Sequence, residues 1–305
     1  MSKKKEYKNV TEIVDRLKKQ NYLCDSQTGY AVMSAINGTP LLIEGEPGTG
    51  KTTLAEAVAK MMGLELIRVQ FYEGITADKI LYDYDYQRQL LTIEAMRPVF
   101  DTKLKDMELD EAMKTAGDVD FYDKGFLIER PLLKAISGKK RYVLLLDEID
   151  KSSEEIEFSL LETLDTYSMS IPQYGTVTCP DDKKPIVFIT SNNYRELSDA
   201  FRRRCNYLYI YPKTVRELTD IITAKTKVNE TLAAGIAKAV EDIRELPLRH
   251  KPSTAEAVLW ASYCKDGSYG SALDAAKLTV IKDKEDIKTL ESDTALISKI
   301  IQFRW

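Results

Sequence analysis

Residues 45–52 read Gly-Glu-Pro-Gly-Thr-Gly-Lys-Thr, which matches the phosphate-binding pattern G-x-x-x-x-G-K-[ST] in full. Glycines in such a loop let backbone N–H groups turn inward around a phosphate, and the start of the following helix adds partial positive charge. Lys51 is expected to reach the β- and γ-phosphates of a nucleotide, and Thr52 to coordinate Mg²⁺. The candidate nucleotide-binding residues are therefore Gly45, Glu46, Pro47, Gly48, Thr49, Gly50, Lys51, Thr52 and Thr53.

Two carboxylates follow the apolar stretch 142–146, which reads Tyr-Val-Leu-Leu-Leu. Ligands of open α/β sheets lie at the carboxyl ends of the strands, so both side chains are expected near the phosphates. Asp147 would hold Mg²⁺ through water, and Glu148 would polarise an attacking water. This pair favours a hydrolase over a kinase or a static binder. No Asn-Lys-x-Asp guanine-reading motif occurs, which favours ATP over GTP.

Polar residues also end the stretch 189–193, Ile-Thr-Ser-Asn-Asn. An amide at this point can touch the γ-phosphate or the catalytic water, and we select Asn192 first and Asn193 second. An Asx turn that merely closes the strand is the alternative.

Three consecutive arginines, 202–204, precede the last predicted strand and cannot all face one way. One of them could act as an arginine finger on the γ-phosphate of a neighbouring subunit, which would require a ring or filament. A solvated basic face is the alternative.

The elements that must position these residues follow from short apolar runs separated by helical stretches. Continuous Leu, Ile and Val predict strands buried on both faces, and their alternation with helices predicts a parallel α/β sheet. The predicted strands are 40–44, 64–70, 142–147, 185–190 and 207–211. The pattern loosens over about 71–141, which we interpret as an elaborated insertion, exposed over 101–124. A β-hairpin is predicted at about 168–179.

Only helical segments follow Pro212, at roughly 214–226, 229–246, 253–265, 269–283 and 293–302. Thr214 and Ser253 each precede a glutamate by three residues, which fits capping boxes at two of these helix starts. We therefore divide the chain into a sheet domain, 1–212, and a helical domain, 213–305.

Composition excludes several other chemistries. The 305 residues include 44 Lys and Arg against 48 Asp and Glu, so the formal charge of −4 argues against a duplex-DNA protein coated in basic residues. A single histidine, His250, excludes metalloprotease and His-rich metal sites. The four cysteines are far apart, without a CxxC pair, and indicate reduced thiols. No signal peptide or apolar run of ~20 residues is present, so a cytoplasmic location without a membrane span is expected.

The order of strand, phosphate loop, helix, Asp-Glu pair, asparagine, late arginine and helical lid resembles the layout of AAA+ ATPases. The details are similar to the MoxR group, especially its CoxD-like members. The stretches that carry this narrower resemblance are 81–91 (LYDYDYQRQLL), 126–133 (FLIERPLL) and 195–205 (RELSDAFRRRC). The resemblance covers nearly the whole chain. It implies an AAA+ P-loop core, with a parallel five-stranded sheet between helices, and a C-terminal all-α lid domain.

The resemblance also implies roles for individual residues. Walker A and Walker B roles go to Lys51, Thr52, Asp147 and Glu148. Asn192 matches sensor 1, and Arg204 matches the arginine finger, with Arg203 adjacent. The hairpin before sensor 1 would face a ring pore, whereas a plain surface hairpin is the alternative.

One position departs from the AAA+ pattern. A sensor 2 arginine usually opens a lid helix, but here that position is Ala255, within Pro-Ser-Thr-Ala-Glu. Arg249 or Lys251 could substitute. Without sensor 2, the arginine finger would carry more of the coupling between subunits.

The function implied by the resemblance is Mg²⁺-dependent ATP hydrolysis by a homo-oligomeric ring, expected to be a hexamer. Such a ring would remodel or mature a client protein or complex, beside a partner with a von Willebrand factor A domain. Two rivals stay open. One is a DNA-linked AAA+ motor or loader, which the arginine cluster and the hairpin allow. The other is a non-catalytic nucleotide switch, which the intact Asp147-Glu148 pair opposes.

Overall fold

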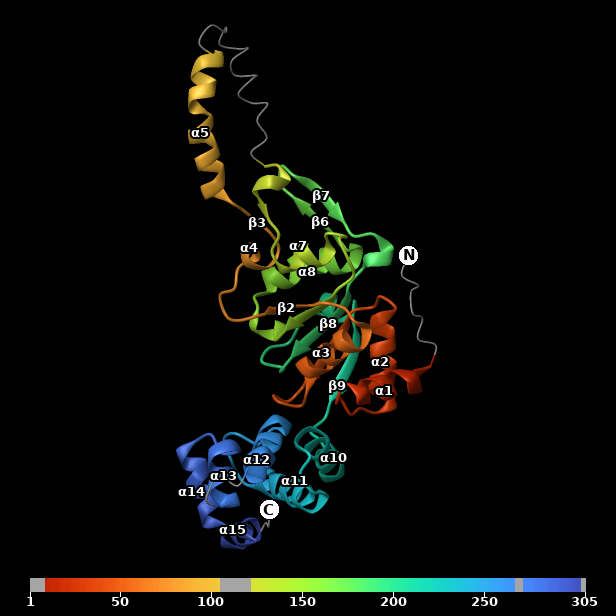
Figure 1. The fold of residues 1–305 in the computed structure, drawn as a ribbon, viewed down its shortest axis with the longest axis vertical. Coiled ribbons are helices and arrows are strands. Elements are labelled where there is room, and N and C mark those ends of the chain that lie inside the picture. Colours follow the sequence, from red (N-terminus) through yellow and green to blue (C-terminus); the bar gives the residue numbers. More distant parts are fainter. Residues whose placement is uncertain (1–8, 105–121, 267–270, 303–305) are drawn as a thin grey trace.

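A five-stranded parallel sheet is the centre of the N-terminal part of the chain (Figure 1). The computed structural model describes residues 9–104, 122–266 and 271–302. The strand order is β2-β5-β8-β1-β9. The strands are β1 (Leu41–Gly45), β2 (Leu66–Gln70), β5 (Val143–Asp147), β8 (Ile186–Ser191) and β9 (Asn206–Ile210). Each predicted strand is present with ends shifted by one or two residues, so the predicted fold class is confirmed.

Helices cover both faces of this sheet because the central strands are apolar on both sides. Leu41 and Ile43 of β1 pack into a core with one group of helices, whereas Leu42 between them packs into the core on the other face. The first group is α1 (Val10–Lys19), α2 (Ser26–Ile36) and α3 (Lys51–Met62). The second is α7 (Pro131–Ile136), α8 (Glu154–Thr166) and α9 (Asp199–Arg202). Both faces of the sheet are thus buried, and the loop that follows β1 lies at its carboxyl edge.

Helix α2 was not predicted, because its sequence combines Gly29 with weakly patterned small residues. The glycine has a packing reason, since a methyl group there would lie 2.8 Å from Val10 Cγ1 of α1. Asp25 begins the helix, and its side chain accepts a hydrogen bond from Thr28 N at 2.8 Å. Tertiary packing against α1 therefore stabilises a helix that periodicity alone does not reveal.

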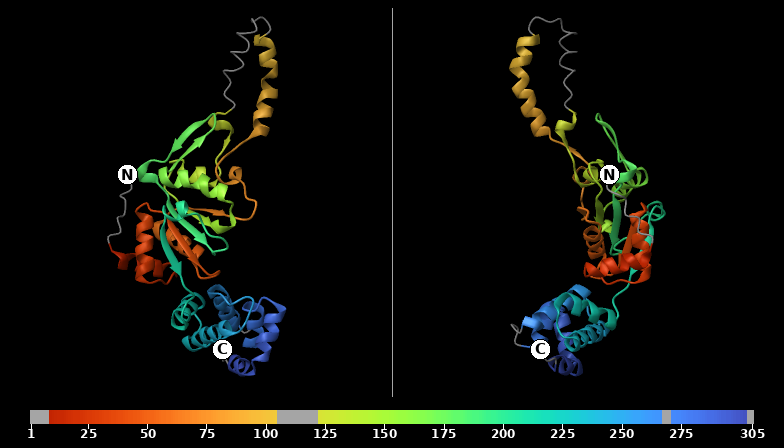
Figure 2. Two further views of the ribbon diagram at one scale, coloured as in Figure 1. Left: turned by 180° about the vertical axis from the view of Figure 1, so that it is seen from behind. Right: turned by 45° about the vertical axis from the view of Figure 1, so that its right-hand side comes forward.

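The C-terminal part consists of helices around a second apolar core (Figures 1 and 2). At its centre Trp260 is fully buried and donates from Nε1 to Ala272 O at 3.0 Å. The helices are α10 (Val215–Thr226), α11 (Glu230–Glu245), α12 (Thr254–Asp266), α13 (Ala272–Thr279), α14 (Lys284–Ser292) and α15 (Thr294–Ile301). Both predicted capping boxes form, at Thr214 and Ser253.

The helix predicted over 269–283 is wrong in its bounds. Residues 269 and 270 lie outside the described residues, and α13 ends at Thr279. A new helix, α14, starts after Asp283, whose side chain accepts from Glu285 N at 2.7 Å. The predicted helix thus ran past the end of α13, and α14, which an aspartate caps, lies in a stretch for which no helix was predicted.

The segment expected as an insertion contains several elements. Helix α5 (Tyr86–Leu104) extends away from the sheet (Figures 1 and 2). Its base is formed by α4 (Ala77–Ile80), the short pair β3 (Asp83–Tyr84) and β4 (Leu127–Ile128), and a 3₁₀ turn, η1 (Lys124–Phe126). Most of the expected exposed stretch, 105–121, lies outside the described residues. Helix α7, at the end of the segment, belongs to the core, because Leu132 and Leu133 are buried.

A β-hairpin follows α8 at the predicted place. Strands β6 (Ser168–Ile171) and β7 (Gly175–Thr178) pair antiparallel, and the turn between them includes Gln173 at φ 63°. Met169 and Ile171 are buried beneath the hairpin, which fixes it on the core. Among the described residues, no helix combines the length and apolar character needed to cross a bilayer.

Candidate nucleotide-binding and hydrolysis site

The phosphate loop joins β1 to α3 and closes around the side chain of Lys51. The Lys51 Nζ atom donates to Gly45 O at 2.6 Å and to Glu46 O at 2.9 Å. Burial lowers the pKa of Lys51, with nearby carboxylates acting in the opposite direction. Gly50 precedes the helix at φ 100°, a conformation that glycine adopts freely. The ammonium group is therefore held inside the loop, where phosphate oxygens could replace the two carbonyls.

A cluster of oxygen atoms lies beside the first turn of α3. Thr52 Oγ1 donates to Asp147 Oδ1 at 3.0 Å, and Thr190 Oγ1 donates to the same atom at 2.5 Å. Hydroxyl and carboxylate oxygens are the ligands that Mg²⁺ prefers, so this donor set fits the metal expected from the sequence. Arg68 Nη2 lies 2.5 Å from Asp147 Oδ2. The Arg68 side chain is half exposed and can leave this oxygen when a metal competes for it.

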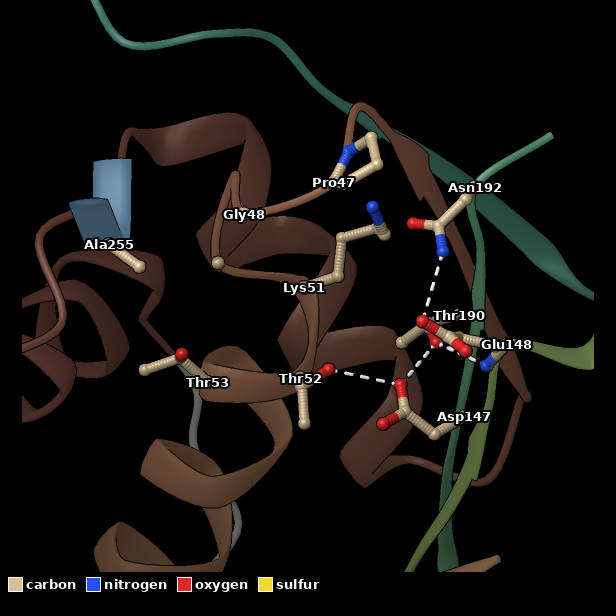
Figure 3. A pocket seen from close by; sticks show the side chains of 11 residues that line it. Pro47, Gly48, Lys51, Thr52, Thr53, Asp147, Glu148, Thr190, Asn192 and Ala255 are labelled. Carbon is tan, nitrogen blue, oxygen red and sulfur yellow. Dashed lines mark hydrogen bonds between the residues drawn. The ribbon is translucent and has the colours of Figure 1, made fainter. Parts of the chain in front are cut away.

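Three side chains hold the carboxylate of Glu148. Asn192 Nδ2 donates to Glu148 Oε1 at 3.1 Å (Figure 3). Gln70 Nε2 and Lys151 Nζ donate to Glu148 Oε2 at 2.8 and 2.7 Å. Glu148 itself has φ 59°, because β5 ends there and the 3₁₀ turn η2 (Ile149–Lys151) begins. The structure thus brings the predicted base and the predicted polar contact within hydrogen-bonding distance.

These groups line one cavity of about 180 Å³ (Figure 3). Its lining residues are Pro47, Gly48, Gly50, Lys51, Thr52, Thr53, Asp147, Glu148, Thr190, Asn192 and Ala255. Most predicted site residues are therefore gathered in one place. Gly45 contributes its carbonyl to Lys51, Thr49 is buried against Glu46 O, and Asn193 does not line this cavity.

A second cavity, of about 440 Å³, lies between the loop residues 46–49 and the helical part. Arg249 and Lys251 line this second cavity, whereas Ala255 lines the first. Ala255, at the position expected for sensor 2, thus lines the phosphate cavity but has no charged side chain. Arg249 Nη1 instead lies 3.4 Å from Asp283 Oδ2, in the same helical part of the chain.

The side chains of the three arginines at 202–204 lie in three different environments. Arg202 Nη2 lies 2.8 Å from Glu44 Oε1, and Arg204 Nε lies 2.5 Å from Asp165 Oδ2. Arg203 is exposed, and within the described part of the chain its side chain makes no hydrogen bond or ion pair. None of the three lines either cavity. This segment therefore contributes no cation to the lining of the phosphate cavity of its own chain.

Sequence reasoning missed several residues of the site, namely Arg68, Gln70, Lys151, Thr190 and Asp150. Arg68 and Gln70 lie on β2, and only the strand order places that strand beside β5. Asp150 is buried, and its Oδ2 accepts from Asn192 N at 3.0 Å and Tyr194 N at 2.8 Å. Thr190 and Asp150 could have been noticed, since each lies within two residues of a motif residue.

We expect Gly48→Ala to weaken ATP binding by about tenfold, equivalent to about 1.4 kcal/mol. Gly48 has φ 75°, and a methyl group there would overlap Ser253 Cβ at the start of α12. Titration with a fluorescent ATP analogue measures the effect. Gly63→Ala is the matched control, because Gly63 has φ 66° and nothing within 4 Å of the added atom.

Both alanine variants should lose about 1–2 kcal/mol of stability from the left-handed backbone. Adding Ser253→Gly to Gly48→Ala should restore part of the ATP affinity, because it removes the overlapping atom. Equal ATP affinity in the Gly48 and Gly63 variants would contradict the importance of the close approach between Gly48 of the phosphate loop and Ser253 at the start of α12.

The fold and the site define a P-loop ATPase of the AAA+ class. Residues 40–205 match the family described as AAA domain (dynein-related subfamily), which is more than half of the chain. The chain therefore belongs to this family.

Two curated relatives and one solved structure illustrate the similarity. Lon protease of Fusobacterium nucleatum is 26% identical over 61% of this chain and 20% of its own length. Replication factor C subunit 3 of Arabidopsis thaliana is 24% identical over 75% of this chain and 58% of its own length. The RuvB Holliday junction branch migration motor of Thermotoga maritima is 17% identical, with a TM-score of 0.44, and the match covers 94% of this chain and 72% of that chain. This chain thus spans a fifth to about three fifths of these curated relatives.

Proposed function

We propose that this protein hydrolyses ATP with Mg²⁺ in the cavity between α3 and the ends of β5 and β8. The observation that carries the proposal is the common lining of that cavity by Lys51, Thr52, Asp147, Glu148 and Asn192. A phosphate-binding loop, an oxygen donor pair and a carboxylate with a polar partner are the parts that phosphoryl transfer to water requires.

Each polar residue of the cavity would have its own chemical role. Lys51 would leave the carbonyls of Gly45 and Glu46 and donate to the β- and γ-phosphates. Thr52 and Asp147 would hold Mg²⁺, and the ion would supply positive charge that offsets the charge developing on the phosphates. Glu148 would accept a proton from the attacking water, with Asn192 fixing its carboxylate or the water.

We expect EDTA in excess over Mg²⁺ to stop turnover. Thr52→Val should raise the Mg²⁺ concentration needed for half-maximal rate, because it removes the hydroxyl that lies 3.0 Å from Asp147. A phosphate-release assay across a Mg²⁺ titration measures both effects. Thr92→Val, on the distant helix α5, is the control and should leave the titration unchanged. An unchanged Mg²⁺ requirement in Thr52→Val would contradict the metal assignment.

The proposed active form is a homo-oligomeric ring, a hexamer as the resemblance implies. The phosphate cavity is lined by two carboxylates but by a single cation, Lys51. The charge of a γ-phosphate in transfer would be stabilised by a further cation besides Lys51 and Mg²⁺, and Ala255 does not provide one. Arg204 would supply it from the next subunit, with Arg203 as the second candidate. The exposed pair of Arg204 with Asp165 costs only ~0–1 kcal/mol to give up.

The MoxR resemblance supports a role in remodelling or maturing a client protein or complex in the cytoplasm. The partner would carry a von Willebrand factor A domain. The hairpin β6–β7 would face the ring pore, and α5, which extends from the core, offers a further contact for a partner (Figure 2). Copurification of a tagged chain with such a partner tests this role, and stimulation of ATP hydrolysis by the partner would support it.

A DNA-linked motor or loader is the second candidate function. The similarity to a replication factor C subunit over 75% of this chain favours it. A salt-dependent increase in ATP hydrolysis on adding DNA would support this candidate. An unchanged rate with single- and double-stranded DNA would favour the protein-remodelling role.

A further inference from the structure

Glu44 is a buried carboxylate directly before the phosphate loop. Only 4% of the residue is exposed, at the end of β1 and next to Gly45. A buried charge is costly unless it is paired and hydrogen-bonded. Arg202 Nη2 donates to Glu44 Oε1 at 2.8 Å, and the Tyr207 hydroxyl donates to Oε2 at 2.9 Å. Both oxygens of this carboxylate are therefore satisfied by side chains from the arginine segment and from β9.

This ion pair joins two parts of the protein that have different tasks. On one side, β1 leads into Gly45, whose carbonyl holds Lys51. On the other side, Arg202 ends α9 and directly precedes Arg203 and Arg204. The backbone of that turn is itself ordered, since Arg204 N donates to Phe201 O at 3.2 Å. A shift of Arg202 would therefore move the arginines that follow it.

The two anchors of the arginine segment differ in strength. The Arg204–Asp165 pair is exposed on both sides, with 38% and 41% of the side chains accessible, so water and salt screen it. In the Arg202–Glu44 pair the carboxylate is only 5% exposed. Removing the arginine would leave an uncompensated buried charge, so this pair resists opening. The pair with Glu44 is thus the one that fixes the orientation of the segment.

We propose that Arg202, through Glu44, is a positioning residue for the arginine that the subunit presents to its neighbour. The inference rests on the proposed function above. It deepens that function by naming the ion pair, Arg202 with Glu44, that orients the arginine finger. Arg202 does not line the phosphate cavity of its own chain, and its role would be exerted through the arginines that follow it. It links the phosphate loop of one subunit to the arginine that completes the adjacent site.

Mixed assemblies test this inference because they separate the two roles of a subunit. The donor chain carries Lys51→Ala, so it holds no productive ATP but keeps its arginines. The acceptor chain carries Arg203→Ala and Arg204→Ala, so its own site is intact and it offers no finger. Neither chain alone should hydrolyse ATP, whereas the mixture should recover activity at acceptor sites beside donors. Arg202→Met is then placed in either the donor or the acceptor.

We expect Arg202→Met in the donor to lower the recovered rate by at least about tenfold, since a displacement of about 1 Å can cost roughly 10²-fold. The same change in the acceptor should leave the recovered rate nearly unchanged. Loss only in the acceptor, loss in both positions or loss in neither would overturn the inference. No recovery in the parent mixture would instead overturn the arginine contact between subunits in the proposed function, which that mixture tests without any change at Arg202.

Further variants distinguish a positioning role of Arg202 from a general loss of folded structure. Glu44→Gln in the donor should behave like Arg202→Met, and combining the two should lower the rate no further. Arg202→Lys should recover part of the activity because it keeps the charge. Tyr207→Phe removes only the second hydrogen bond to Glu44 and should preserve rescue. Thermal unfolding of each donor identifies variants that fail to fold. A folded Glu44→Gln donor that rescues fully would also overturn the inference.

Discussion

Glu148→Gln is expected to leave ATP binding intact and to lower the hydrolysis rate by about 10²–10⁴-fold, the usual contribution of a general base. The glutamine amide occupies the same space and can still accept from Asn192, but it cannot take a proton from water. With the amide oxygen accepting from Asn192, the amide N–H₂ would face Lys151 Nζ and Gln70 Nε2, so these two donors would lose their acceptor. Equilibrium binding of a fluorescent ATP analogue and steady-state phosphate release measure the two properties separately.

The matched control for this change is Glu154→Gln. Glu154 begins α8 a few residues later and is exposed, so it should keep both binding and turnover. Hydrolysis at the normal rate in Glu148→Gln would show that the base has been misassigned. A loss of ATP binding in that variant would point instead to a structural role for the carboxylate.

Arg204→Ala should lower hydrolysis by about 10³–10⁵-fold, the range typical of arginine fingers in general. The expected reason is the loss of a cation at the γ-phosphate of the neighbouring site, since Arg204 does not line its own cavity. Mixing Arg204→Ala with Lys51→Ala should restore activity, because each chain supplies what the other lacks. Phosphate release as a function of the mixing ratio measures this rescue.

Arg16→Ala, in an exposed pair with Glu12 on α1, is the control and should retain full activity. Absence of rescue in the mixture would argue against a contact between subunits. Arg203→Ala, measured in parallel, decides between the two candidates. A large loss in Arg203→Ala with a normal rate in Arg204→Ala would assign the finger to Arg203.

The core elements of the fold could be predicted from the sequence because their signals are local. Continuous apolar runs predicted every strand of the sheet, and the eight-residue loop 45–52 specifies its own backbone through its glycines. The two capping boxes were also predicted, since three residues of spacing define them. Helix α2 was not predicted, because packing at Gly29 decided it. Helix α14 was not predicted either, although its cap at Asp283 is a local signal.

Within the site, the sequence by itself determined the chemistry: a phosphate loop, an Asp-Glu pair and an amide at the ends of buried strands. Only the tertiary structure decided which other groups act on them. Strand order brings Arg68 to Asp147 and Gln70 to Glu148, and the chain between β2 and β5 gives no sign of that pairing.

The tertiary structure likewise separated three adjacent arginines, one toward buried Glu44, one toward solvent and one toward Asp165. The physical reason is that motifs and helix caps depend on neighbours along the chain. Strand pairing and buried ion pairs depend on groups that folding brings together from distant positions.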